Sequence, residues 1–512
     1  MSAKASAAKL PKQVVVAKDL LDLLTGAMYT NPFSALREYV QNAVDAIEDA
    51  ASDGVLESIS QGKIEISVSP QDRSIVIRDN GIGCSNQDFA QSLTAFGGSG
   101  KRGRERRGFR GIGRLAGLAY CRELVFRGRS ATDSRILEMV WDCVKLKDLL
   151  YSDDKDLSLN QIVHSVVEIK DVRADEYPEH FFEVTLRGVI RYKNDELLDQ
   201  TALQNYLAQV APVPFSPDFS FGSEVAEFLS SHIGDQSFNI FFDSSEEPLY
   251  KPYRNTFLAK ADVSSHFSHI EYVKLPGIHQ DIDAIGWIMH HEYLGAISPD
   301  QVIGGLRLRS GNIQIGGNGS LRTIFPQARF NEWCCGEIHV LNSKIRPNGR
   351  RDNLEFNAHV SNLYDKLRPV GTSVALKCRK FSNTRSMLNS FEKSCADSEF
   401  LMGLLSEGYF GSAKADKYLE YLNEREDQLA EMADQLADQI SDGAMLKKRL
   451  TNWRRKRSNS LRKMQSGSAG PSLPKTKAST YHRVFEAIYD ELRDKGEAAA
   501  AIRRVADAAS KK

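Results

Sequence analysis

The sequence predicts an α+β protein, with layers of sheet and helix first in the chain and helices alone at its end. Three observations carry this prediction. Residues 63–78 alternate apolar and polar side chains as two paired strands do. Residues 236–370 alternate strand-like runs with turns, and helical spacing takes over from about residue 371. A length of 512 residues suggests about three domains.

The first predicted element is a helix that begins near residue 31. Asn31 is a good N-cap, and Pro32 suits the first helical position. Glu38, Asn42 and Asp45 fall at i, i+4 and i+7, so they share one face. The apolar residues that recur at helical spacing are Phe33, Leu36, Val40, Ala43 and Ile47.

The polar face of this helix suits metal-assisted hydrolysis. A carboxamide oxygen is a hard ligand for Mg²⁺, so Asn42 could hold the metal. Glu38, one turn away, could orient and deprotonate an attacking water. Asp45 is a further candidate nucleotide contact. Taken alone, the same residues also fit a solvated polar stripe on an amphipathic helix.

A second box follows the predicted hairpin of residues 63–69 and 74–78. Asp79 ends the second strand, and Gly81 and Gly83 come next. A carboxylate here can accept the exocyclic amine of adenine, and the glycines let the backbone approach a planar ring. The alternative is a simple Asp-Asn-Gly turn.

A third box closes a glycine-rich, basic stretch over residues 96–113. A glycine loop that opens a helix presents bare N–H groups and the positive end of a dipole to phosphate. An apolar helix is expected to follow through Leu115 and Leu118. Residues 94–110 would form a mobile lid, whose cations would equally suit contact with nucleic acid. The lid cations are Lys101, Arg102, Arg104, Arg106 and Arg107, and the candidate nucleotide contacts are Ser99, Gly100, Lys101, Gly108, Gly111, Ile112 and Gly113.

In order and spacing, the three boxes resemble the N, G1 and G2 motifs of the GHKL superfamily: gyrase, the ninety-kilodalton heat-shock chaperones, histidine kinases and MutL. LREYVQNAVDAI (36–47) is similar to the chaperone helix, and IVIRDNGIGCS (75–85) to the adenine-binding box. The resemblance implies a Bergerat-type fold, an antiparallel sheet backed by helices, that binds ATP and Mg²⁺. It implies Glu38 as general base, Asn42 as magnesium ligand and Asp79 as the reader of adenine.

Two later segments resemble the S5-like middle domain of the chaperones. GGLRLRSGNIQIG (304–316) is similar to its Arg-rich strand, and residues 329–356 are similar to the next strand and loop. There the family places an arginine just before an acidic residue, and Arg351 fits this position. Such an arginine reaches the γ-phosphate and stabilises the charge in transfer. Arg350 is the neighbouring candidate, and residues 347–349 alone would predict only a surface turn.

Two features depart from the chaperone pattern. The chaperones carry a Gly-Thr pair on the last strand of the ATP domain, where the threonine supports the adenine-reading aspartate. Here the strand reads PEHFFEVTLRGV (178–189), and Thr185 lies on it out of register. No segment resembles the C-terminal dimerisation domain. The resemblance therefore covers roughly residues 15–370.

Composition narrows the class of protein. A net charge of zero argues against a protein that coats nucleic acid. The seven cysteines form no CxxC pair, which supports neither a zinc site nor a disulfide framework. No apolar run approaches the roughly 20 residues of a membrane span, and the first residues lack the apolar core of a leader peptide. The expected location is the cytoplasm, with no membrane partner.

The boundaries predict six segments. They are a GHKL ATP-binding domain (1–190), a helical connector (191–235), a middle α/β domain with the catalytic-arginine loop (236–370), a helical region with a charged hairpin (371–465), a flexible linker (466–478) and a C-terminal helical segment (479–512).

Residues 416–463 are polarised in charge. The first half is acidic and carries heptad-spaced leucines, whereas the second half holds only basic charges. The favoured interpretation is a helical hairpin whose arms attract each other. The alternative is a basic helix, Lys447–Lys463, that binds nucleic acid with Trp453 interleaved.

The C-terminal segment predicts an interaction or dimerisation element. It has an apolar helical face past a flexible linker, and such a face must dock on this chain or on a partner. The residues of this face are Val484, Phe485, Ile488, Tyr489 and Leu492.

Together these features predict an ATP-driven conformational switch of the chaperone type. The lid would close over ATP, two N-terminal domains would associate as a homodimer, and slow hydrolysis would reopen them while a client or partner protein is remodelled. The alternative is an ATP-gated DNA clamp like the MORC and MutL relatives, in a multi-gene defence or repair system. A histidine kinase fits less well, because kinases carry the ATP domain after a phospho-acceptor helix.

Overall fold

A computed structural model describes residues 31–95, 113–152, 158–173, 177–243, 245–260, 263–279, 281–440, 443–466, 473–474 and 476–510. The chain divides into two compact units, residues 1–376 and 377–512. The first unit holds two large sheets with their helices, and the described elements of the second are all helices. The predicted α+β class is confirmed.

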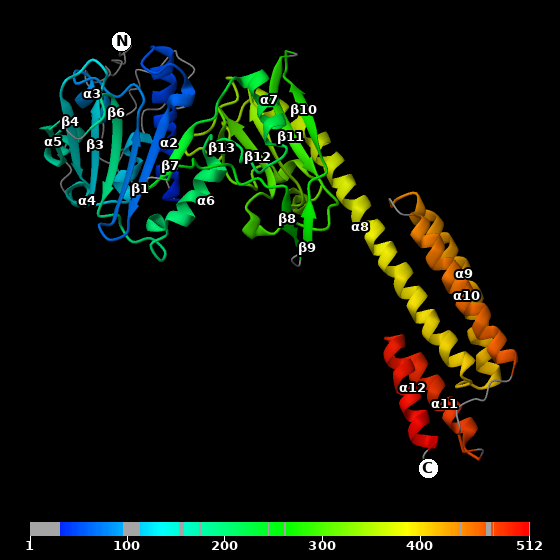
Figure 1. Ribbon diagram of the computed structural model, residues 1–512. Coiled ribbons are helices and arrows are strands. Elements are labelled where there is room, and N and C mark those ends of the chain that lie inside the picture. The colour runs from blue at the N-terminus through cyan, green and yellow to red at the C-terminus, as the bar shows by residue number, and fades with distance from the viewer. Residues whose placement is uncertain are drawn as a thin grey trace, which may run out of the picture. The chain divides into compact units, whose positions relative to one another are not determined.

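The first sheet of unit 1 has seven strands in the order β5-β4-β3-β6-β2-β1-β7 (Figure 1). Neighbouring strands are antiparallel except β1 and β7, which run parallel. The predicted hairpin is confirmed, because β1 (Lys63–Ser69) and β2 (Ser74–Asp79) pair antiparallel, and Asp79 ends β2. The other strands are β3 (Glu123–Arg129), β4 (Ile136–Asp142), β5 (Val167–Val172), β6 (Phe181–Arg187) and β7 (Asn239–Phe242).

The main helix of this layer is α2 (Phe33–Ser52). Asn31 caps its first turn, since Asn31 Oδ1 accepts the Phe33 N–H at 3.0 Å. Val40, Val44 and Ile47 of α2 belong to the same buried core as the inward side chains of β1 and β2. The remaining short helices are η2 (Ile59–Gln61), α3 (Phe89–Thr94), η3 (Gly113–Ala119), α4 (Cys143–Tyr151) and α5 (Leu159–Val166).

The helix predicted after the third box differs in type from the expectation. Residues 113–119 form the 3₁₀ helix η3 rather than an α-helix. Its Leu115 and Leu118 are buried against α2 as the apolar pattern requires. The short, tight helix brings the chain to β3 within a few residues, and runs of 3₁₀ helix are normally brief.

The strand register decides the question of Thr185. Asp79 pairs with Phe182 across β2 and β6, so both lie on the face that covers the core. Thr185 is an odd number of residues away and lies on the opposite face, where its Oγ1 donates to Glu183 at 3.2 Å. That face carries an ion pair of 2.6 Å between Glu183 and Arg127. Thr185 therefore cannot support Asp79.

Helices follow strand β6, within the segment expected to be a helical connector. They are η4 (Glu196–Leu198), α6 (Gln200–Val210) and α7 (Gly222–Ile233). Strand β7 comes next and pairs with β1, so the chain returns to the first sheet before it enters the second.

The second sheet of unit 1 has five strands in the order β10-β11-β14-β12-β13. Only β12 and β14 pair in parallel. A small ladder of β8 (Thr256–Ala259) and β9 (Val263–His266) lies beside it in sequence. The five strands are β10 (His269–Pro276), β11 (Ile282–His290), β12 (Gly305–Ser310), β13 (Ile313–Ile315) and β14 (Cys335–Val340), with the short helices η6 (Pro299–Gln301), η7 (Arg322–Ile324) and η8 (Ala328–Trp333) between them.

A buried ionic network joins the connector to the second sheet. Glu337 is fully buried and accepts from Arg309 Nε at 2.6 Å and from Lys251 Nζ at 2.9 Å. Arg309 also donates to the carbonyl of Gln209 at the end of α6, at 2.7 Å. Burial lowers the pKa of Lys251 to about 7. The network holds the end of α6 against β12 and β14.

Unit 2 is a helical bundle, as the sequence predicts. It contains the later part of α8 (Ala358–Ser406), which begins before the expected residue 371, and four further helices. None of the helices described in either unit is long and apolar enough to span a membrane. The four are α9 (Ser412–Ala437), α10 (Gly443–Gln465), α11 (Ala478–Glu491) and α12 (Lys495–Ser510).

One expectation for the C-terminal region is wrong. Trp453 is fully buried in the bundle core and cannot interleave with a nucleic acid. Part of the apolar face of α11 docks on its own unit, because Phe485 packs on Tyr409 and Tyr489 packs on Tyr418. Val484 and Leu492 of the same face are exposed, and the interaction or dimerisation element stays a prediction. The linker residues 467–472 and 475 lie outside the described ranges.

The buried network predicts a large loss of stability when its acid is removed. Glu337→Gln leaves Lys251 and Arg309 buried without a counter-charge and should lower the free energy of unfolding by about 3–5 kcal/mol. Urea unfolding of the full chain measures this loss. Glu332→Gln, which breaks the exposed pair with Arg322, is the matched control and should cost less than about 1 kcal/mol. Equal losses in both variants would contradict the account.

Candidate functional site

The polar face of α2 forms the floor of the site. Glu38 and Asp45 are buried, and Asn42 between them is half-buried. The Asn42 side chain makes no hydrogen bond to any described residue, whereas the apolar face of the same helix is packed on the sheet. A buried helix that leaves one carboxamide free beside a carboxylate is suited to hold a ligand rather than a core contact.

The second box lies directly against α2. The Ile82 N–H donates to Ala46 O at 3.0 Å. A Cβ at Gly81 would lie 2.6 Å from the carbonyl carbon of Ala46, so only glycine allows this approach. Gly83 has φ +71°, and a Cβ there would meet Arg129 O. The glycines of this box are therefore required for its packing, and their contact with adenine remains a prediction.

Asp79 is a buried carboxylate that forms no ion pair with the described residues. It is 5% exposed, and its hydrogen bond within the described chain comes from the Gly81 N–H at 2.9 Å. Burial raises the pKa of Asp79 to about 7, and the bond from Gly81 opposes this rise only in part. A carboxylate held this way gains from a ligand that brings an N–H donor, such as the exocyclic amine of adenine.

The third box reaches Glu38 from the other side. A Cβ at Gly113 would lie 2.6 Å from Glu38 Oε2, so the backbone of Gly113 stands against the carboxylate itself. The Gly117 N–H donates to Tyr39 Oη at 2.7 Å and fixes η3 on α2. The predicted contacts Ser99, Gly100, Lys101, Gly108, Gly111 and Ile112, and the lid cations Arg102, Arg104, Arg106 and Arg107, lie outside the described residues.

The loop after β14 brings an arginine to Glu38. Arg351 Nε lies 3.3 Å from Glu38 Oε1, and each side chain is 10% exposed. Arg351 has φ +54°, an uncommon backbone conformation for this residue, and its carbonyl accepts the Gly316 N–H at 2.8 Å. The loop keeps the turn that its sequence alone predicts, with Arg350 and Asp352 exposed, and it also buries Arg351 against Glu38.

The structure separates the two candidate arginines. The Arg351 side chain is buried against Glu38, whereas the Arg350 side chain is exposed and its carbonyl accepts from Arg37 Nη2 at 3.0 Å. Sequence reasoning missed Arg37. Its Nη2 also lies 3.4 Å from Glu38 Oε1, and its side chain is 6% exposed. Only its place directly before Glu38 could have drawn attention to it.

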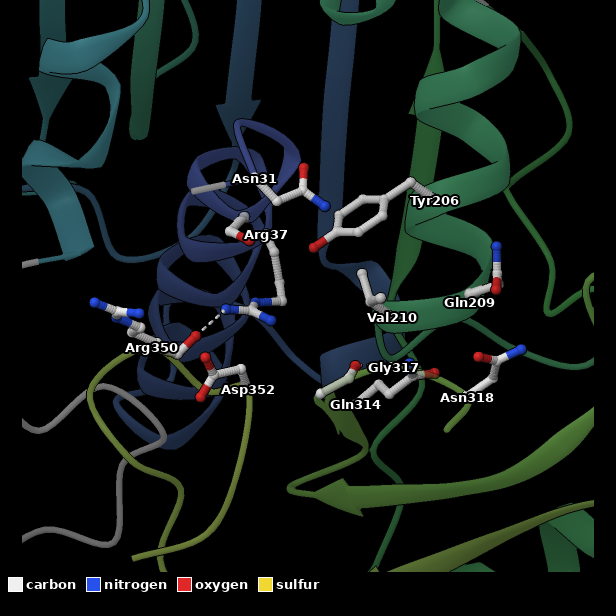
Figure 2. Close-up of a pocket in the computed structure, with 12 residues that line it drawn as sticks. Asn31, Arg37, Tyr206, Gln209, Val210, Gln314, Gly317, Asn318, Arg350 and Asp352 are labelled. Atoms are coloured by element: carbon white, nitrogen blue, oxygen red, sulfur yellow. Dashed lines mark hydrogen bonds between the residues drawn. The ribbon is translucent and has the colours of Figure 1, made fainter. Parts of the chain in front are cut away.

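A cavity of about 410 Å³ opens beside this cluster (Figure 2). Arg37 extends along it toward the Arg350 carbonyl, and the buried Arg37 Nε has no hydrogen-bond partner among the residues that the structure describes. The cavity lies between the start of α2, the end of α6, and the loops after β13 and β14. Its lining residues are Asn31, Ser34, Arg37, Tyr206, Gln209, Val210, Gln314, Gly316, Gly317, Asn318, Arg350 and Asp352.

The donor set around Glu38 fits a metal that arrives with its ligand. In the described ranges no group of three or more His, Cys, Asp or Glu side chains could hold a metal ion. Asn42, one turn from Glu38, offers a carboxamide oxygen. Mg²⁺ is commonly bound through one or two protein oxygens together with the phosphates of a nucleotide. The predicted role of Asn42 therefore fits a magnesium–nucleotide complex and not a resident metal.

Comparisons with known proteins agree with this geometry. Residues 29–169 match the family described as histidine kinase-, DNA gyrase B-, and HSP90-like ATPase. The chain is similar to the chaperone protein HtpG of Nitrosospira multiformis, at 39% identity over 90 residues, 17% of this chain and 14% of the relative. HtpG of Buchnera aphidicola is 36% identical over the same shares, and HtpG of Halorhodospira halophila is 34% identical over 107 residues, 20% of this chain and 17% of the relative.

These matches confirm the GHKL resemblance for the first domain. The chain spans less than a fifth of the length of the curated relatives it matches. The matched residues include the whole polar face of α2, β1, β2 and the second box. They stop well before β14 and its loop, so the place of Arg351 rests on the contact with Glu38.

The raised pKa of Asp79 predicts pH-dependent nucleotide binding. Below about pH 7 the free protein holds Asp79 protonated, whereas a donor amine in the complex stabilises the ionised carboxylate and lowers its pKa. Binding then releases a proton, so affinity for ADP should rise as pH rises toward 7 and level off above it. Calorimetry of ADP binding across this range measures the effect.

Asp79→Asn is the matched control, because it keeps the shape of the side chain and removes its titration. The phosphate of ADP titrates equally with both proteins, so the difference between their profiles isolates Asp79. We expect the variant to bind ADP at least about 10-fold more weakly. Identical pH profiles would show that Asp79 does not read the nucleotide.

Proposed function

We propose that this chain is a cytoplasmic, Mg²⁺-dependent ATPase that uses ATP binding and slow hydrolysis to change its conformation and remodel a client protein. The observation that carries the proposal is the contact of 3.3 Å between Glu38 and Arg351. A general base for water and a cation for the γ-phosphate must both reach the same phosphorus atom. Glu38, on α2 of the first sheet layer, would be the general base, and Arg351, in the loop after β14 of the second sheet, would be the cation.

Asp79, Asn42 and Glu38 would each contact a different part of the magnesium–nucleotide complex. Asp79 would accept the exocyclic amine of adenine at the end of β2, and Asn42 would ligate Mg²⁺ together with the phosphate oxygens. Gly113 stands against Glu38, so a triphosphate following the backbone of the third box would place its γ-phosphate near this carboxylate. Mg²⁺ would supply charge neutralisation on the phosphates.

Hydrolysis would require Arg351 to change partner. Glu38 Oε1 lies 3.3 Å from Arg351 Nε and 3.4 Å from Arg37 Nη2, so the two cations occupy the side of the carboxylate that an attacking water would need. The γ-phosphate carries more charge than one carboxylate and would draw Arg351 away. Glu38 could then take a proton from water as the water oxygen attacks the γ-phosphorus and ADP leaves.

The dimer and the client are proposed by analogy with the relatives. The HtpG proteins that the chain resembles are named chaperones, and that name applies to them. We propose for this chain a homodimer gated by ATP, a client or partner protein as substrate, and turnover limited by assembly of the site. An ATP-gated DNA clamp is the second candidate, and the exposed basic residues of α10 favour it.

Variants of three side chains test the ATPase. Glu38→Gln should reduce ATP hydrolysis at least about 100-fold while ATP still binds, because only the proton acceptor is lost. Arg351→Gln should cost about 100-fold or more, because charge on the γ-phosphate loses its partner. Arg350→Gln should cost less, since its side chain is exposed. Phosphate release measured at saturating ATP gives all three rates.

If Arg350→Gln lost more ATP hydrolysis than Arg351→Gln, Arg350 and not Arg351 would be the arginine that contacts the γ-phosphate. Full activity in Glu38→Gln would remove the general base and with it the proposal. Exposed Arg346, in the same loop, provides the control for nonspecific loss of charge, and Arg346→Gln should retain wild-type rates.

Dimer gating predicts that activity depends on protein concentration. If two chains must associate before the site closes, ATP turnover per chain should rise with concentration and then saturate. The rise should be absent in Glu38→Gln and should vanish at concentrations where sedimentation shows only monomer. A constant rate per chain across a monomer–dimer transition would contradict the gating.

A further inference from the structure

The cations of α10 form two sets that face different ways. One set makes ion pairs within unit 2. Arg449 pairs with Glu399 of α8 at 2.6 Å, and Arg454 pairs with Glu426 of α9 at 2.9 Å. Lys456 and Arg457 join the same two acids. These four cations fill the seams of α10 with α8 and α9, which confirms part of the attraction expected between the hairpin's arms.

The other set lies on the outer side of α10. Lys448, Arg455 and Arg462 are exposed and follow one another at seven-residue intervals, so they form a straight stripe with steps of about 10.5 Å. No ion pair reaches any of the three within the described residues. We call this set the outer stripe. Its neighbours on the same side are Lys447, Thr451, Asn452, Ser458, Asn459 and Lys463.

The outer stripe lies opposite the bundle core. Leu446, Leu450 and Trp453 point into the core from the other side of α10. The sequence of α10 contains no acidic residue, and its one aromatic residue is Trp453, which is fully buried. The outer side therefore offers cations, hydroxyls and carboxamides, with neither an acid to neutralise them nor an aromatic ring.

The acids of α9 do not cover this stripe. Glu420, Glu424, Asp427, Glu431 and Asp434 are exposed on the side of α9 away from its buried leucines. The seam between α9 and α10 is occupied instead by the Glu426 pairs.

We propose that the outer stripe of α10 binds the phosphodiester backbone of a nucleic acid. Lys, Arg, Ser, Thr and Asn are the side chains that contact phosphate and sugar. A helix of 23 residues is about 35 Å long, close to one turn of duplex DNA. Because the one aromatic ring of α10, Trp453, is buried on the other side, the contact reads the backbone without base stacking and without sequence preference. This proposal does not depend on ATP hydrolysis.

The test is a salt titration of the full chain with a short, fluorescently labelled DNA duplex. The wild type should bind with an affinity that falls steeply as salt rises. In the triple variant Lys448→Gln, Arg455→Gln, Arg462→Gln, the slope of log affinity against log salt should shrink by about 2.7, and affinity at low salt should fall at least about 30-fold. A single-stranded RNA of equal length should bind more weakly than the duplex.

The matched control removes the same charges from other places in unit 2. Lys417, Arg483 and Arg493 are also exposed, with no ion pair to the described residues, and their triple Gln variant should bind DNA as the wild type does. Circular dichroism checks that both variants keep their helices. Equal losses in the two variants would overturn the proposal, because net charge rather than the stripe would then govern binding.

Absence of DNA and RNA binding by the wild type at low salt would also overturn it. In that case self-association can be followed by sedimentation. Loss of self-association in both the outer-stripe variant and a Glu424→Gln, Glu431→Gln variant of α9 would assign the stripe to the acids of a second copy instead.

Discussion

Arg37 and Arg350 are 313 positions apart in the sequence, yet a hydrogen bond of 3.0 Å joins them, and next to it Glu38 meets Arg351. This contact between α2 and the loop after β14 is the constraint on which the rest of unit 1 depends. It requires a left-handed backbone at Arg351, a glycine at 113 and a second sheet held firmly against α6. The Arg309–Glu337 network supplies the last of these.

The two carboxylates of the site have opposite surroundings, and this difference organises their chemistry. Asp79 is buried with one N–H donor and no cation among the described residues, and burial raises its pKa to about 7. Glu38 lies between two guanidinium groups. Asp79 suits a neutral N–H donor on the ligand. Glu38 suits a ligand with more negative charge, which would compete with it for Arg351. Under the proposed function, Asp79 would select the adenine base and Glu38 would respond to the phosphates.

Much of this could be predicted from the sequence because it is local. Alternation of apolar residues predicted β1 and β2, and helical spacing placed Glu38 and Asn42 on one face. What could not be predicted depends on contacts between distant segments. Arg350 and Arg351 are adjacent residues of the same type, so the sequence leaves both as candidates, and only the fold shows that the Arg351 side chain is the buried one. Trp453 lies in a basic segment, so its sequence context fits either contact with nucleic acid or a place in the bundle core. Tertiary packing places it in the core. Nothing in the sequence marks Arg37 as a site residue except its position directly before Glu38.

The most direct test of the central claim is a crystal structure of the Glu38→Gln variant with ATP and Mg²⁺. The account predicts that Arg351 leaves residue 38 and donates to the γ-phosphate, that Asn42 ligates the metal, and that the Asp79 carboxylate accepts the exocyclic amine of adenine. A γ-phosphate that lies away from both residues, with Arg351 still against residue 38, would contradict it.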